Sequence, residues 1–200
     1  MTRGALVHSP IVLFRHVRDR EHRWLRAFVP VILLAVLTAA NAGMISSRTV
    51  TASGIDSGVG LFVVVAALVV SAIGTLLIVA GSVFVVSLFH LLATGSGSRK
   101  LIECALIAYW VQVPWSLVGL SMIAVLFQPE PGGDVERAIE DVRRMPTVRL
   151  AGIIGAYFTA WTSALHAAAL RVVSKFYVLT SIVCWIFLSG LFAVLPWWLG

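Results

Sequence analysis

The chain has 200 residues, of which 60% are hydrophobic and 12% charged, and its mean hydropathy is +0.98. A soluble globular domain carries about a quarter charged residues, so this composition excludes that class. Several apolar runs exceed the roughly 18 residues that span a bilayer core, and they identify an integral membrane protein. The formal net charge of +6 lies in short loops between these runs, where basic residues set membrane topology and touch lipid headgroups. We therefore expect membrane lipids as partners and no nucleic acid.

The first segment, residues 1–24, is mostly polar and carries five arginines against Asp19 and Glu21. Ser9 followed by Pro10 is typical of a helix start, because proline is tolerated in the first turn. Two interpretations remain open for this segment. It is either a short interfacial helix whose basic side faces anionic lipid, or a solvated cytoplasmic tail. We expect the first apolar run to be retained as a helix, because a signal peptide would place that run much closer to the start.

Residues 25–199 are predicted to form a single all-α membrane domain, a bundle of five transmembrane helices. The expected spans are about 25–45, 59–93, 101–127, 150–170 and 176–199. A loop of turn-favouring residues, SSRTVTASGIDSG, is expected after the first span. The second run is roughly 52 Å long at 1.5 Å per residue, well over a bilayer core of ~30 Å. It must tilt, kink or project beyond the membrane.

Small side chains predict where the helices approach one another closely. In the second run, Gly74 and Gly81 are the expected places for any bend, and Gly74 shares a small-residue face with Ala67 and Ser71. The fourth run carries small residues at every fourth position, which places this helix at the centre of the bundle. The predicted helix-packing residues are Gly74, Gly81, Gly152, Gly155, Ala156, Ala160 and Ala164.

The third run contains Pro114 near its middle. Proline removes one backbone hydrogen bond, so we expect a kink and a freed carbonyl near Trp110. The segment after this run has Asp134 as a good N-cap, and apolar residues repeat behind it at helical spacing up to Pro146. It is too short to span a bilayer, so we expect an extracytoplasmic amphipathic helix on the membrane surface. Cys104 and Cys184 lie in apolar runs and are interpreted as packing residues.

The distribution of Lys and Arg predicts the orientation. With five spans, ten of these residues fall on the side of the N-terminus and five on the other side, four of them in the loop after the third span, which also carries five acidic residues. Cytoplasmic loops carry the excess of basic residues, so the N-terminus is expected in the cytoplasm and the C-terminus outside.

Ionisable residues in membrane spans are costly to bury and are therefore candidates for function. Here they are His90 and Glu103, which flank a cytoplasmic turn, and His166 in the fourth span. Together they suggest a cluster for a metal or a proton relay, because histidine is the usual ligand and proton switch. The alternative is a structural ion pair between Glu103 and Lys100. No metal-binding spacing such as HExxH supports the first interpretation, so neither a metal nor another cofactor is expected.

A second group of polar and aromatic residues is predicted near the proline. Tyr109, Gln112 and Trp115 surround Pro114, and Tyr157 and Trp161 lie on the fourth span. They either form a pocket for a lipid or small solute, or they satisfy the carbonyls at the kink and one another. The sequence contains no nucleotide-binding loop, GxSxG elbow, HExxH pair or rhomboid-like serine motif, so an enzyme is not expected.

Three segments carry a resemblance to a known family: SPIVLFR, FHLLATGSGSRKLIECALIAYWVQVPW and YFTAWTSALHAAALRVVSKFYVLTSIV. With five spans, N-terminus in and C-terminus out, the chain resembles the Yip1 domain of Yip1/YIPF-type membrane proteins over about residues 9 to 199. Eukaryotic members are linked to Rab-dependent vesicle traffic and to shaping of ER and Golgi membranes. They carry a longer cytoplasmic N-terminal region than this chain, so the resemblance implies a prokaryotic member in the cell membrane.

Two functions from different classes remain open. The leading hypothesis is a non-enzymatic membrane organiser, or an accessory subunit of a membrane complex, that works through helix and lipid contacts. Its expected partners are lipids and other membrane subunits or a second copy of itself. The alternative is a small oligomeric transporter or channel-like protein that uses the kinked third helix.

Overall fold

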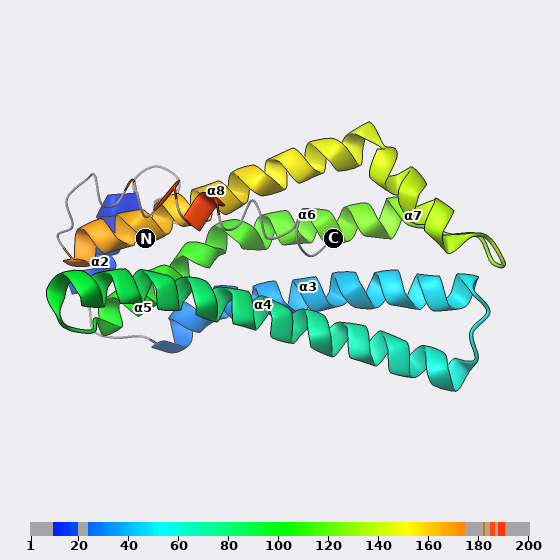
Figure 1. Cartoon of the computed structure of the whole chain (residues 1–200), viewed down its shortest axis with the longest axis horizontal. Coiled ribbons are helices and arrows are strands. Elements are labelled where there is room, and N and C mark those ends of the chain that lie inside the picture. Colours follow the sequence, from blue (N-terminus) through cyan, green and yellow to red (C-terminus); the bar gives the residue numbers. More distant parts are fainter. Residues whose placement is uncertain (1–9, 20–23, 175–181, 183–184, 187, 191–200) are drawn as a thin grey trace. The chain divides into compact units, whose positions relative to one another are not determined.

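We analysed a computed structural model, which describes residues 10–19, 24–174, 182, 185–186 and 188–190. Every regular element in these ranges is helical, and Figure 1 shows their order. The elements are α2 (Pro10–Asp19), α3 (Trp24–Ala52), α4 (Ser57–Thr94), α5 (Arg99–Ala108), the 3₁₀ helix η1 (Tyr109–Val111), α6 (Gln112–Leu126), α7 (Val135–Arg144) and α8 (Pro146–Ser174).

Among the described residues, four helical segments are long and apolar enough to cross a membrane: Leu25–Ala52, Ser57–Thr94, Arg99–Leu126 and Pro146–Ser174. These four segments correspond to the first four predicted spans. Together they indicate a multi-pass membrane protein. The fifth predicted span, 176–199, lies almost wholly outside the described residues, as does Cys184. The number of five spans therefore stays a prediction.

The end of the first span differs from the prediction. A loop was expected from Ser46 onward, but α3 continues to Ala52. Arg48, in this extension, donates through Nη1 to the Ile123 carbonyl and through Nη2 to the Ala124 carbonyl, both at 2.9 Å. Its Nη1 also donates to the Phe127 carbonyl just beyond α6. This tertiary contact outweighs the weak helix propensity of the serines and threonines around Arg48.

The second apolar run is one helix, as its length predicted, and it is unbroken through Gly74 and Gly81 (Figure 1). It ends at Thr94 and is followed by Gly95, whose φ of +69° suits glycine and whose N–H donates to the Leu91 carbonyl at 2.8 Å. Ser98 then caps α5 by accepting from the Leu101 N–H at 3.3 Å. The short polar turn between α4 and α5 therefore contains the glycine that ends one helix and the serine that caps the start of the next.

The third run is interrupted, but not where Pro114 alone would place the break. Regular α-helix ends at Ala108, and η1 occupies Tyr109–Val111 before α6 begins at Gln112. The amide of Tyr109 bonds to Leu106 and Ile107 and not to Ala105, four residues before it. The break in the helix therefore begins closer to the start of the span than Trp110, whose carbonyl is the one that Pro114 was expected to free.

The amphipathic segment is a helix, α7, with Asp134 as its N-cap. The Asp134 side chain accepts from the N–H groups of Glu136 at 3.0 Å and Arg137 at 3.2 Å. The fourth span begins at Pro146 and not at Leu150, because proline stops α7 and then occupies the first turn of α8. Met145 between them has the extended ψ of 131° that a residue before proline prefers. The position of α7 on a membrane surface stays a prediction.

The chain divides into two compact units, each built from portions of the long helices. Unit 1 comprises Met1–Val31, Ile78–Gln112 and Ala156–Gly200, and unit 2 comprises Ile32–Leu77 and Val113–Gly155. The core of unit 1 contains ten buried side chains: Phe14, Val86, Leu101, Cys104, Ala108, Leu165, Ala169, Leu170, Val172 and Leu188. Phe14 belongs to α2, so the N-terminal helix shares the core formed by α4, α5 and α8.

Polar bonds also connect α2 to its neighbours in unit 1. Arg18 Nη1 donates to the Val172 carbonyl near the end of α8, and Lys100 Nζ donates to the Val17 carbonyl near the end of α2, both at 3.2 Å. Phe14 is buried in the core of unit 1, and Ile11 and Val17 pack against it partly buried, which favours the helix over the solvated tail. The location of residues 10–19 in the headgroup region stays a prediction.

Unit 2 is held together by close contacts between α3 and α4. Thr38 Oγ1 lies 2.7 Å from Thr75 Oγ1, and the Ser71 hydroxyl donates to the Thr38 carbonyl at 3.1 Å. Small residues let the two backbones approach, because a Cβ added at Gly43 would lie 2.6 Å from Leu68 Cδ2. Unit 2 therefore combines tight packing with hydrogen bonds between helices.

The predicted helix-packing glycines have different surroundings. A Cβ at Gly155 would lie 2.8 Å from Trp115 Nε1, so this glycine admits the indole of the third span. A Cβ at Gly74, Gly81 or Gly152 would meet no atom within 4 Å. A Cβ at Gly60 would lie 2.4 Å from Val50 Cγ1. Close packing in the described part of the chain therefore uses Gly43, Gly60 and Gly155, of which only Gly155 was among the predicted residues.

Candidate functional site

All six buried polar or charged side chains among the described residues belong to unit 1: Ser82, His90, Glu103, Thr162, Ser163 and His166. They come from α4, α5 and α8. Burying a polar group without a hydrogen-bond partner is costly, so the partners of these side chains decide what the group does. Three of the six were predicted site residues, namely His90, Glu103 and His166.

His166 lies beside the interrupted part of the third span. Its Nε2 is 3.1 Å from the Ala105 carbonyl, which is the carbonyl that the Tyr109 amide does not use. A carbonyl only accepts, so Nε2 carries the proton, and the side chain is a neutral imidazole or an imidazolium. The ring is fully buried and meets the Tyr109 ring edge-on, with centroids 5.5 Å apart at 61°.

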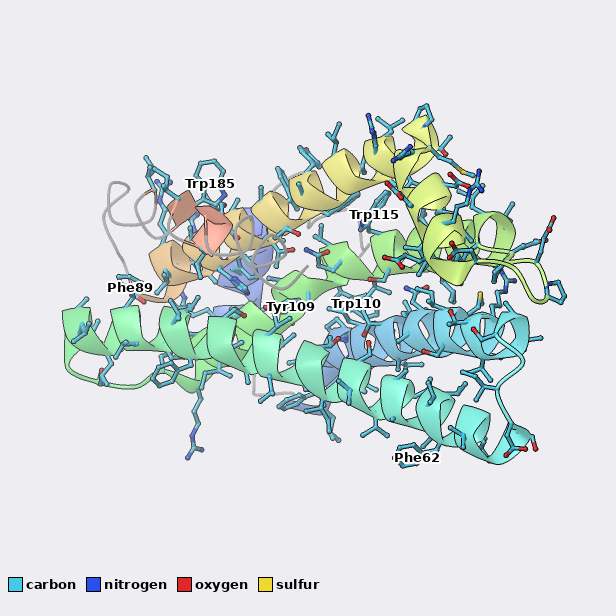
Figure 2. The ribbon with its side chains drawn as sticks, turned by 45° about the vertical axis from the view of Figure 1, so that its right-hand side comes forward. Phe62, Phe89, Tyr109, Trp110, Trp115 and Trp185 are labelled. Atoms are coloured by element: carbon cyan, nitrogen blue, oxygen red, sulfur yellow. The ribbon has the colours of Figure 1, made fainter. Side chains whose placement is uncertain are left out.

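Tyr109 and Gln112 are held at either end of η1. The Tyr109 hydroxyl is hydrogen-bonded to Ser82 on α4, and Figure 2 labels Tyr109 where the third span is interrupted. Gln112 Nε2 donates to Thr162 Oγ1 on α8 at 2.9 Å. The sequence missed Ser82 and Thr162. Thr162 carries a signal in retrospect, because it lies four residues before His166 and so shares its helix face.

His90 and Glu103 have partners of their own. His90 Nδ1 lies 2.5 Å from Ser174 Oγ, which connects α4 to the end of α8. Glu103 Oε2 lies 3.7 Å from Lys100 Nζ, the ion pair weighed as the structural alternative. No three His, Cys, Asp or Glu side chains in the described ranges come together to hold a metal ion. In the described structure His90, His166 and Glu103 therefore do not form a metal-binding group, and a proton relay through them stays a prediction.

The remaining predicted site residues do not belong to this set of buried polar side chains. Pro114 is exposed and belongs to unit 2. Tyr157 is 62% exposed and stacks on Trp161, with ring centroids 6.3 Å apart at 20°. A hollow in unit 2 is lined by Glu136, Ile139, Glu140, Arg144 and Arg149, none of which was a predicted site residue. The pocket proposed for a lipid or solute stays a prediction.

The described part of the chain thus defines a class: an all-helical, multi-pass membrane protein in which several buried polar side chains, such as Ser82, Thr162 and His166, bond one helix to another. A model of the Yip1 domain family matches residues 4–199, essentially the whole chain, and the protein belongs to that family. No curated protein and no solved structure matches the chain. The resemblance drawn from the sequence is therefore confirmed at the level of the family.

Proposed function

We propose that this protein is a non-enzymatic membrane organiser, or an accessory subunit of a membrane complex, that acts through contacts with lipids and with other membrane helices. The observation that carries the proposal is the exposed apolar surface of α4. Only 6% of its most apolar 18-residue window is buried. Large apolar side chains stay exposed along its whole length, among them Phe62 (73%), Leu77 (66%), Phe84 (65%) and Leu92 (75%). Figure 2 places Phe62 on the outer side of this helix.

The length of α4 argues for a protein partner in addition to lipid. Its 38 residues extend roughly 57 Å at 1.5 Å per residue. A tilt of about 40°, the upper end of the range seen for membrane helices, reduces its height to roughly 44 Å. The hydrocarbon core is only about 30 Å thick. Lipid tails alone therefore leave part of this surface uncovered, and a helix of another subunit or of a second copy is suited to cover the rest.

The buried polar residues support the same proposal over the transporter alternative. A solute path through the protein needs polar groups that face a passage. In unit 1 the side chains of Ser82, Gln112 and Thr162 are instead bonded between helices. These groups contribute to holding the helices in place.

Site-specific photocrosslinking in native membranes tests the proposal. A photoreactive residue at Phe84 should crosslink to lipid and to one defined membrane protein that also co-purifies after mild detergent extraction. The same residue at Val86, which is 0% exposed, is the matched control and should give no intermolecular product. Solute flux through the purified protein in liposomes, with no protein crosslinked at Phe84, would instead establish the transporter alternative.

A further inference from the structure

The break in the third span is not explained by Pro114 alone. A proline lacks the N–H that would bond four residues back, so Pro114 leaves the Trp110 carbonyl without its regular donor. The regular donor of the Ala105 carbonyl is the amide of Tyr109, which is an ordinary residue with its N–H intact. That amide bonds to Leu106 and Ile107. A second cause must therefore act on the α5 side of η1.

His166 on α8 supplies a replacement donor at this point. Its Nε2–H lies 3.1 Å from the Ala105 carbonyl, and its side chain is fully buried. One turn earlier on the same face of α8, Thr162 Oγ1 accepts from Gln112 Nε2 at 2.9 Å. The two contacts lie on either side of η1, so α8 holds the chain both before and after the break.

Two bonding arrangements are available to the Ala105 carbonyl. In a regular helix it accepts from the Tyr109 amide, and in the observed structure it accepts from His166. The carbonyl is satisfied in both. A carbonyl oxygen has two lone pairs, so the His166 Nε2–H can bond to it in either arrangement, but only this donor keeps the carbonyl bonded when the Tyr109 amide turns away. The buried histidine therefore favours the interrupted form.

We propose that His166 is the positioning residue that keeps the third span broken at Tyr109–Val111, so that η1 is a hinge whose geometry is set by α8 and not by Pro114 alone. The hinge has two arrangements, because the Ala105 carbonyl either accepts from the Tyr109 amide, as in a regular helix, or keeps His166 as its donor when that amide turns away. A force or partner that displaces α8 from α5 would release the Ala105 carbonyl and let the helix close.

The bonding also predicts a spectroscopic signature for His166. If the imidazole is neutral, a proton on Nε2 leaves Nδ1 as an acceptor. Nδ1 is buried and has no hydrogen-bond partner. In the full-length protein in lipid bilayers, ¹⁵N NMR should therefore show a protonated Nε2 in contact with the Ala105 carbonyl and a bare Nδ1. Protonation on Nδ1 with a bare Nε2 would overturn the proposal.

Variants separate the roles of His166 and Pro114. His166→Gln keeps an N–H donor close to the position of the ring Nε2, and His166→Leu removes it. Backbone ¹³C shifts of residues 109–111 should stay those of a 3₁₀ turn in His166→Gln and in Pro114→Ala. In His166→Leu they should move to regular α-helical values. A break that survives in His166→Leu and disappears in Pro114→Ala would overturn the proposal.

A further pair keeps the test decisive if His166→Leu does not fold. His166→Asn has the same amide as His166→Gln, but its shorter side chain places the donor away from the Ala105 carbonyl. The glutamine variant should keep the 3₁₀ shifts and the asparagine variant should lose them. Identical shifts in the two variants would show that the position of the donor does not matter and would refute the role given to His166.

Discussion

Arg48 brings a permanent positive charge to the contact between α3 and the end of α6. The last carbonyls of a helix have no partners within it and carry its partial negative charge, so a cation there is favourable. The planar guanidinium reaches the carbonyls of Ile123, Ala124 and Phe127 together. From the sequence Arg48 was only a charge in an expected loop, because its three acceptors lie some 75 residues further along the chain.

Arg48→Ala should lower the free energy of unfolding by about 1.5–3 kcal/mol, the range for hydrogen bonds to charged groups. Arg48→Lys should recover only part of this stability, because an ammonium does not present the same fork of donors. Denaturant unfolding in detergent micelles measures both effects. The control is Arg99→Ala, an exposed substitution expected to stay within about 0.5 kcal/mol of the wild type. Equal stabilities of Arg48→Ala and the control would contradict the role of this residue.

At the scale of elements, α2 is a short helix that depends on its neighbours. A helix of ten residues is marginal by itself, so its stability comes mainly from tertiary packing. Phe14 provides the central contact, and Arg18 and Lys100 add bonds at the ends of α8 and α2. The sequence predicted a helix start at Ser9 and Pro10. It did not predict the docking, because the residues that receive Phe14 are distributed over three distant helices.

Phe14→Ala should release α2 from the core of unit 1. Truncating a fully buried phenylalanine typically costs about 3–5 kcal/mol, which exceeds what two exposed or half-buried polar contacts supply. The expected result is faster limited proteolysis within the first 24 residues, read by mass spectrometry, while the membrane spans stay protected. Arg15→Ala on the exposed side of α2 is the matched control and should leave the cleavage rate unchanged. Equal rates in the two variants would show that Phe14 does not anchor the helix.

At the scale of the whole molecule, the four long apolar helical segments found among the described residues are those of a multi-pass membrane protein, and the chain belongs to the Yip1 domain family. The orientation is a proposal that rests on the excess of basic residues on the N-terminal side. It places the turn between α4 and α5 in the cytoplasm and the turn between α3 and α4 outside. A prokaryotic cell membrane remains the expected location.

Single cysteines test this orientation, in a variant whose Cys104 and Cys184 are replaced. A membrane-impermeant thiol reagent added to intact cells should label Ser53→Cys and spare Ser96→Cys. Both sites should react after the cells are opened. A reporter fused after Gly200 should be active in its extracytoplasmic form if the fifth predicted span crosses the membrane. Labelling of Ser96→Cys in intact cells would reverse the orientation, and a cytoplasmic reporter with correct cysteine labelling would remove only the fifth span.

The sequence by itself determined the membrane class, the family, the length of α4 and the helix start at Asp134. These features depend on composition, on runs of apolar residues or on side chains within one turn of the backbone they cap. Only the tertiary structure decided that α3 extends past Ser46, that Phe14 of α2 is buried and that the third span breaks at Tyr109. Each of these depends on a partner from another helix, as when His166 takes the place of the Tyr109 amide at the Ala105 carbonyl. A pattern read along one helix contains no information about such a donor.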